Sequence, residues 1–95
     1  MTKWYQQLMK KGEIKIGSLV YIVEEVEHLD NDDDLGCCNW QLQRIQIEKD
    51  LSQEMKEVVL IHEIIHAINN QMEEKETEFL AQSIYQVFKE NNILK

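Results

Sequence analysis

Apolar side chains recur at helical spacing over residues 2–11, which predicts a short helix. Residues 13–26 alternate between apolar and polar or small side chains, and Gly17 and Ser18 interrupt the alternation, which predicts a β-hairpin or two short strands. Residues 38–47 alternate again around a turn expected at residues 41–44. The apolar positions of these alternations are Ile14, Ile16, Val20, Ile22, Val26, Cys38, Trp40, Ile45 and Ile47. We therefore expect these segments to form a small sheet of about three strands.

The spacing changes to that of helices from Asp50 onward. Asp50 followed by Gln53 resembles a capping box, so a helix is expected to begin there. Apolar residues occupy nearly its whole circumference in the C-terminal half, which is typical of a buried helix. A second helix is expected from about Glu73 to Asn91, with an apolar face made of Leu80, Ala81, Ile84, Val87 and Phe88. Strands followed by two helices indicate an α+β fold, and the length of 95 residues indicates one domain over residues 1–95.

Charge and composition narrow the class of partner. The chain carries 18 Asp and Glu against 10 Lys and Arg, a net charge of −8, so it lacks the basic surface that nucleic acids and anionic membranes require. The sequence shows no secretory signal and no apolar run of membrane-spanning length. Its only two cysteines, Cys37 and Cys38, are adjacent, which disfavours a disulfide between them. We therefore expect a cytoplasmic protein that binds neither nucleic acid nor membranes, and the oligomeric state stays open.

The candidate chemistry lies in the first long helix. His62 and His66 are four residues apart, so on a helix they project from one face within reach of a single ion. With Glu63 they form the His-Glu-x-x-His pattern, in which the imidazoles bind Zn²⁺ and the glutamate acts on a water at the metal. The alternative is a pair of core histidines with local hydrogen bonds. The spacing, the interposed glutamate and the apolar neighbours favour zinc, because unpaired imidazoles there would carry a desolvation cost.

A catalytic zinc needs a third protein ligand and an open position. Asn69 and Met72 occupy the places where metzincins have glycine and histidine, which excludes that class. His28, the one remaining histidine, lies beside an acidic loop, so an acid on the second helix is expected to complete the site. Helix phase places Glu74 on the side that faces the first helix, and we predict it as the third ligand. Glu78, one turn later, is predicted to accept a hydrogen bond from a ligand histidine, or to be the alternative ligand.

The letters HEIIH followed by EKETEFLA resemble the gluzincin arrangement, with Glu74 in the place of the family's metal ligand, Thr77 in its alanine place and Glu78 in its aspartate place. The segments VLIHEIIHAI and LAQSIYQVFKEN are similar to very small metallopeptidases of the ImmA/IrrE type, which phages and mobile elements carry. The resemblance covers residues 50–91 well and the strand region more loosely. It implies a minimal zincin domain, in which a small antiparallel sheet precedes an active-site helix and a ligand-bearing helix. It also implies a zinc-dependent peptidase that cleaves a regulatory protein such as a repressor.

On this hypothesis Glu63 takes a proton from water and passes it to the leaving amine. An extended protein substrate could pair with an exposed strand edge, which we expect in the region of Trp40, Ile45 and Ile47. No residue is singled out to stabilise the oxyanion.

Two other functions stay open. The chain could be a zinc-stabilised regulatory protein without turnover, because zinc can supply folding energy to a small domain. It could also be a phage or prophage interaction module that acts through its acidic surface, a function favoured by the run Asp30–Asp34. That run is more simply expected to be a solvated loop.

The residue that would stabilise the oxyanion stays open. Tyr85 is expected to lie too far along its helix, which leaves Tyr21 and His28 as candidates.

Overall fold

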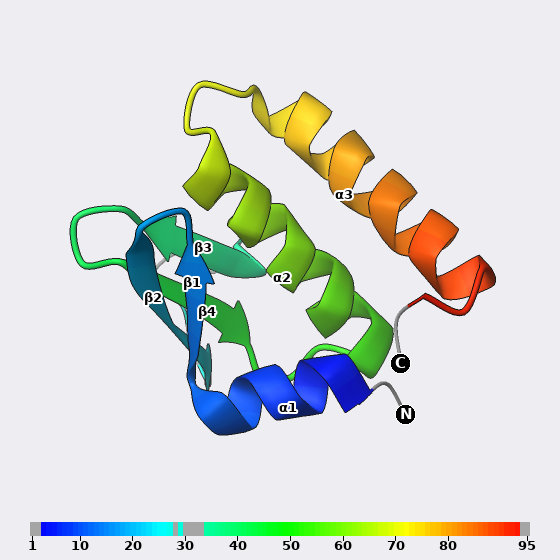
Figure 1. The fold of residues 1–95 in the computed structure, drawn as a ribbon, viewed down its shortest axis with the longest axis horizontal. Helices are drawn as coiled ribbons and strands as arrows, with labels where there is room; N and C mark the ends of the chain where they lie inside the picture. Colours follow the sequence, from blue (N-terminus) through cyan, green and yellow to red (C-terminus); the bar gives the residue numbers. More distant parts are fainter. Residues whose placement is uncertain (1–2, 28, 30–33, 94–95) are drawn as a thin grey trace.

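Helix α2 lies between a four-stranded sheet and helix α3, and helix α1 packs against the strands β1 and β2 (Figure 1). The computed structural model describes residues 3–27, 29 and 34–93. Along the chain the elements are α1 (Lys3–Lys11), β1 (Glu13–Ile16), β2 (Leu19–Val26), β3 (Gly36–Asn39), β4 (Arg44–Glu48), α2 (Gln53–Ile68) and α3 (Glu74–Glu90). The α+β fold expected from the sequence is confirmed. None of the helices in the described ranges is long and apolar enough to cross a membrane.

The sheet is mixed, with the strand order β1-β2-β4-β3. Both predicted hairpins form, because β1 pairs antiparallel with β2 and β3 pairs antiparallel with β4. The two hairpins join through a parallel pairing of β2 with β4. The expectation of about three antiparallel strands was therefore wrong. Alternation predicts each hairpin, but it does not say which strand of the second hairpin pairs with the first. The strand β4 lies inside the sheet, between β2 and β3, and its residues Ile45 and Ile47 are both 0% exposed.

The phase of β2 also differs from the expected set of apolar positions. Tyr21 and Val23 face the core at 3% and 2% exposure, whereas Val20 and Ile22 are 45% and 39% exposed. Residues 19–23 are all apolar, so the letters alone do not fix which face is buried. Glu24 shares the outer face with Val20 and Ile22 and accepts hydrogen bonds from Arg44 and Gln46 across the strands, and alternation turns Tyr21 and Val23 to the core.

The core lies between the sheet, α1 and α2. Its fully buried cluster consists of Tyr5, Tyr21, Val23, Ile45, Ile47, Val59 and Leu60. Helix α2 begins at Gln53 rather than at Asp50, because Ser52 is the N-cap and its Oγ accepts a hydrogen bond from the backbone N–H of Met55 at 3.3 Å. The expected capping box was therefore placed too early.

Helix α3 contacts α2 through a narrower stripe than the sequence predicted. Thr77, Ala81 and Tyr85 are buried at successive turns, whereas the expected face residues Leu80, Val87 and Phe88 are each more than a third exposed. Thr77 and Ala81 are small, so the two helix backbones can approach closely along this stripe. The Thr77 hydroxyl donates a hydrogen bond to the Glu73 carbonyl, which satisfies its polar group. This packing fixes which side of α3 faces α2, and therefore where its first turn lies.

Candidate metal centre

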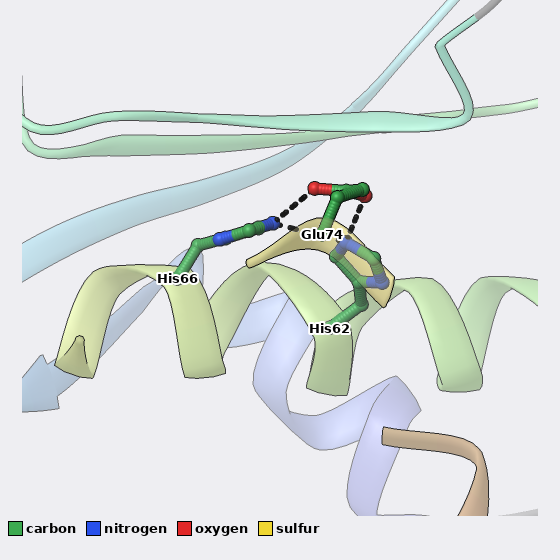
Figure 2. Close-up of side chains that lie close together, drawn as sticks. All are labelled: His62, His66 and Glu74. Carbon is green, nitrogen blue, oxygen red and sulfur yellow. Dashed lines mark hydrogen bonds and ion pairs between the residues drawn. The ribbon is translucent and has the colours of Figure 1, made fainter. Parts of the chain in front are cut away.

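Helix α2 presents two imidazoles side by side on one face. His62 and His66 come from successive turns, and their Nε2 atoms are 3.0 Å apart (Figure 2). Both side chains are largely buried, at 15% and 16% exposure. The helical spacing that the sequence predicted therefore brings the two rings to one point.

Glu74, the first residue of α3, reaches this point from the other side. Its Oε1 is 2.7 Å from His62 Nε2, and its Oε2 is 2.9 Å from His66 Nε2 (Figure 2). A short turn after α2 makes this approach possible, because Asn69 caps that helix and its Oδ1 accepts a hydrogen bond from the Gln71 N–H. The predicted position of Glu74 beside the histidines is confirmed.

The three side chains form a possible metal-binding triad. Two imidazole nitrogens and one carboxylate are the donor set of many catalytic zinc sites, which keep a further position open. Ligand atoms about 2.0–2.1 Å from a tetrahedral zinc are roughly 3.3 Å from one another. The measured separations of 2.7–3.0 Å lie close to that value, so a small outward movement of the three side chains would admit the ion. The residues present therefore fit zinc.

Glu63 lies next to this triad and is buried, with 6% exposure. Burial raises its pKa to about 8, and the negative charges of Glu74 and Asp34 act in the same direction. A bound divalent cation would oppose this shift by favouring the carboxylate. Glu63 is thus a carboxyl group held in a nearly dry place beside the candidate metal ligands.

Gly36 makes room for this arrangement at the start of β3. A Cβ atom built at Gly36 would lie 2.6 Å from Val59 Cγ1 and 3.2 Å from Glu63 Cγ. Real side chains do not tolerate the first distance, so only glycine lets β3 come this close to α2. The sequence does not reveal this role of Gly36, because no local pattern shows that β3 approaches α2 here.

Two hollows flank the triad, and both are lined by Gly36, Glu63 and Glu74. One, of about 260 Å³, opens toward the N-terminal half of α2 and also touches His62. The other, of about 290 Å³, opens toward the far end of β3 and also touches His66. Together they form a cleft along β3 with the triad at its middle.

The strand beside this cleft is β3, not the strand expected from the sequence. Ile45 and Ile47 lie on β4, which has a neighbour on each side, and they belong to the core. The prediction that they form a substrate-binding edge was wrong, because the order of the strands could not be known from alternation. Trp40 does lie at the cleft, just after β3, and its Nε1–H donates a hydrogen bond to the His66 carbonyl at 3.0 Å. It therefore links the β3–β4 turn to the end of the α2 face that bears the two histidines.

Glu78 does not have the place predicted for it. It is exposed and accepts a hydrogen bond from Gln82 at 3.4 Å. Within the described ranges, no hydrogen bond joins it to His62 or His66, and it is not part of the triad. It lies on the wall of the smaller hollow, one turn beyond Glu74.

The candidates for an oxyanion stabiliser are not brought to the triad. Tyr21 is buried in the core beneath the sheet, and Tyr85 donates its hydroxyl hydrogen bond to Glu57 at 2.7 Å. His28 and most of the acidic run, Asp30 to Asp33, fall outside the described residues.

Comparison with known proteins adds no relative: no protein-family model, no curated protein and no solved structure matches the chain. The functional argument therefore depends on the triad and its surroundings.

Proposed function

We propose that this chain is a zinc-dependent metallopeptidase that hydrolyses a peptide bond in a protein substrate. The observation that carries the proposal is the meeting of His62 Nε2, His66 Nε2 and the Glu74 carboxylate within 3.0 Å, with the buried Glu63 beside them. A metal donor set without a neighbouring acid would support only a structural site. The added acid, at the position that the His-Glu-x-x-His pattern gives to a general base, favours hydrolysis.

The residues of the site would have different roles. His62, His66 and Glu74 would hold the ion, which when bound supplies Lewis-acid polarisation of a peptide carbonyl and of water. The Glu63 carboxylate would accept a proton from the attacking water and later deliver it to the leaving amine. Its position supports this role, because the side chain is buried and lines both hollows beside the triad.

The edge of β3 supports binding of an extended substrate. Among the described residues, this strand has a neighbour only on its β4 side, and members of the triad line the hollows along it. A peptide that pairs with β3 would gain main-chain hydrogen bonds and lie across the metal ligands. An antiparallel peptide would run from the Trp40 end of β3 toward Gly36. The residue that follows the cleaved bond would then lie over the smaller hollow.

The resemblance to ImmA/IrrE-type peptidases extends the proposal to the substrate and setting. It favours a regulatory protein, such as a repressor of a phage or mobile element, as the substrate, and the host cytoplasm as the place of action. The acidic chain, with a net charge of −8, fits a protein substrate better than nucleic acid or an anionic membrane.

Replacement of Glu63 by Gln tests the proposal. Zinc-loaded wild type and Glu63→Gln would be incubated with a proteome-derived peptide mixture, and new termini read by mass spectrometry. We expect cleavage by the wild type, its loss with a zinc chelator, and its loss in Glu63→Gln at unchanged zinc content, because the amide cannot accept the proton. Equal cleavage by both proteins would refute the role of Glu63.

A second candidate is a zinc-stabilised regulatory module without turnover. It is favoured by the position of the triad, which joins the end of α2 to the start of α3, so that a bound ion would tether the two helices. This module would bind one zinc ion and gain stability from it, yet wild type would cleave no peptide. An interaction module that needs no metal is a third possibility. It would fold normally when purified without zinc.

A further inference from the structure

The smaller hollow has an apolar wall and a polar rim. Met55, Val58 and Val59 of α2 line it on one side, and Glu78 and Gln82 of α3 line it on the other. Its volume of about 260 Å³ is of the size needed for one long side chain. It lies directly beside His62 and Glu63, so whatever fills it is adjacent to the proposed reaction.

The charged side chains that line this hollow are all acidic. Three carboxyl groups line it, and no lysine or arginine is among the described residues of its wall. Glu74 would be neutralised by the metal, and Glu63 is the proposed base. Glu78 is the remaining carboxylate, and within the part of the chain that the structure describes its hydrogen-bond partner is the neutral Gln82 amide at 3.4 Å. Lys89, farther along α3, is paired with Glu54.

We propose that this hollow selects a lysine or arginine side chain at the position that follows the cleaved bond, with Glu78 as the residue that determines the preference. The inference rests on the proposed peptidase function. The methylene stem of a basic side chain would pack on Met55 and Val58, and its cation would reach Glu78 at the rim. An acidic side chain would meet uncompensated negative charge, and a purely apolar one would leave Glu78 without a charged partner.

A binding experiment tests the preference without requiring turnover. The zinc-loaded Glu63→Gln protein would be titrated against fluorescent peptides that differ at one position, which holds Lys, Met or Glu. An ion pair at an exposed rim contributes about 0.2–1 kcal/mol, so we expect the lysine peptide to bind roughly 1.4–5-fold more tightly than the methionine peptide. The glutamate peptide should bind most weakly.

Substitutions of Glu78 then test whether this residue causes the preference for lysine. Added to the same background, Glu78→Gln should remove the lysine preference, and Glu78→Lys should reverse it in favour of the glutamate peptide. Glu76→Gln is the matched control, because it removes the same charge two residues earlier on α3 and lies outside the hollow. It should leave the preference as it was. Zinc content is measured in each protein.

The outcomes separate this inference from the proposed function. Cleavage sites of the wild type should be enriched in Lys or Arg after the cut bond, and Glu78→Gln should lose that enrichment. Cleavage with another preference at that position would overturn the inference and leave the peptidase standing. Absence of all cleavage would refute the peptidase, and the binding titrations would still decide the preference. Equal affinities, no detectable binding of the lysine peptide, or loss of zinc in Glu78→Gln would each overturn the inference.

Discussion

At the scale of single residues, Glu74 matters most for the proposed site, because among the described residues of α3 it is the one whose side chain contacts both histidines. It is largely exposed, yet both of its oxygens lie against imidazole nitrogens at 2.7 and 2.9 Å. Because the Glu74 side chain is exposed, packing does not hold its carboxylate between the two imidazole rings. On the proposed function, an ion shared by the three side chains would account for this arrangement.

Replacement of Glu74 by Ala should weaken zinc binding strongly. Loss of a group that merely supports a ligand typically costs about 10–100-fold in metal affinity, and loss of a ligand should cost at least as much. Competition with a chromophoric chelator measures the affinity. Glu78→Ala, one turn away on the same helix, is the control and should bind zinc like the wild type. Unchanged affinity in Glu74→Ala would remove Glu74 from the site.

Residue-level reasoning predicted the triad because its members follow from local geometry. The spacing of His62 and His66 fixes their common face, and the phase of α3 turns Glu74 toward α2. The same reasoning misjudged Glu78. One turn of helix separates it from Glu74, but the position of its side chain depends on how α3 rotates against α2, which Thr77 and Ala81 decide.

At the scale of elements, the close packing of β3 on α2 determines the width of the cleft. Gly36 sets this distance, since any side chain there would meet Val59 and Glu63. The contact therefore ties the edge strand to the helix that bears the histidines.

Replacement of Gly36 by Ala should force β3 and α2 apart. We expect a loss of about 1–3 kcal/mol in the free energy of unfolding, as overpacking usually costs. We also expect weaker peptide binding, because the cleft changes shape. Denaturant unfolding of the metal-free protein measures the first effect.

The control for this substitution is Gly17→Ala. Gly17 has a φ of +61° and no atom within 4 Å of an added Cβ, so the substitution should cost about 1–2 kcal/mol of backbone strain only. Peptide binding should be unaffected in that variant. If Gly36→Ala bound peptide as well as Gly17→Ala does, β3 would not form the wall of the substrate cleft.

The sequence largely predicted which segments form helices and strands, but it did not predict which strands pair with one another. Alternation located both hairpins, and helical spacing located α2 and α3 to within a few residues. The parallel pairing of β2 with β4 joins segments far apart in the sequence, and no local pattern encodes it. For that reason Ile45 and Ile47 were assigned to an edge although they lie at the centre of the sheet. Among the described strands, β1 and β3 are the edges of the sheet, and β3 is the edge that lies beside the triad.

At the scale of the whole molecule, all three tyrosines help hold the layers together as neutral groups. Burial is the main cause that raises the pKa of each, to about 12 for Tyr85, whose hydroxyl binds Glu57 between α3 and α2. Burial also raises the pKa of Tyr5 and of Tyr21, and Tyr5 in addition donates a hydrogen bond to Glu25. In the unfolded chain each would ionise near pH 10.

The protein should therefore lose stability as the pH rises above about 10. The unfolded chain then releases protons that the folded protein retains, so each tyrosine lowers the free energy of unfolding by up to about 1.4 kcal/mol per pH unit. For Tyr85 this loss continues until the pH passes about 12. Denaturant unfolding across this range, with Tyr85→Phe as the comparison, measures the slope. A slope as steep in Tyr85→Phe as in the wild type would contradict the assignment for Tyr85.

The central claim is that one zinc ion joins α2 to α3 at the triad. Anomalous diffraction at the zinc edge, on crystals of the zinc-loaded protein, tests it most directly. We predict one strong peak about 2.0–2.2 Å from His62 Nε2, His66 Nε2 and a Glu74 oxygen. A peak at other residues, or a triad that remains hydrogen-bonded without an ion in excess zinc, would contradict the claim.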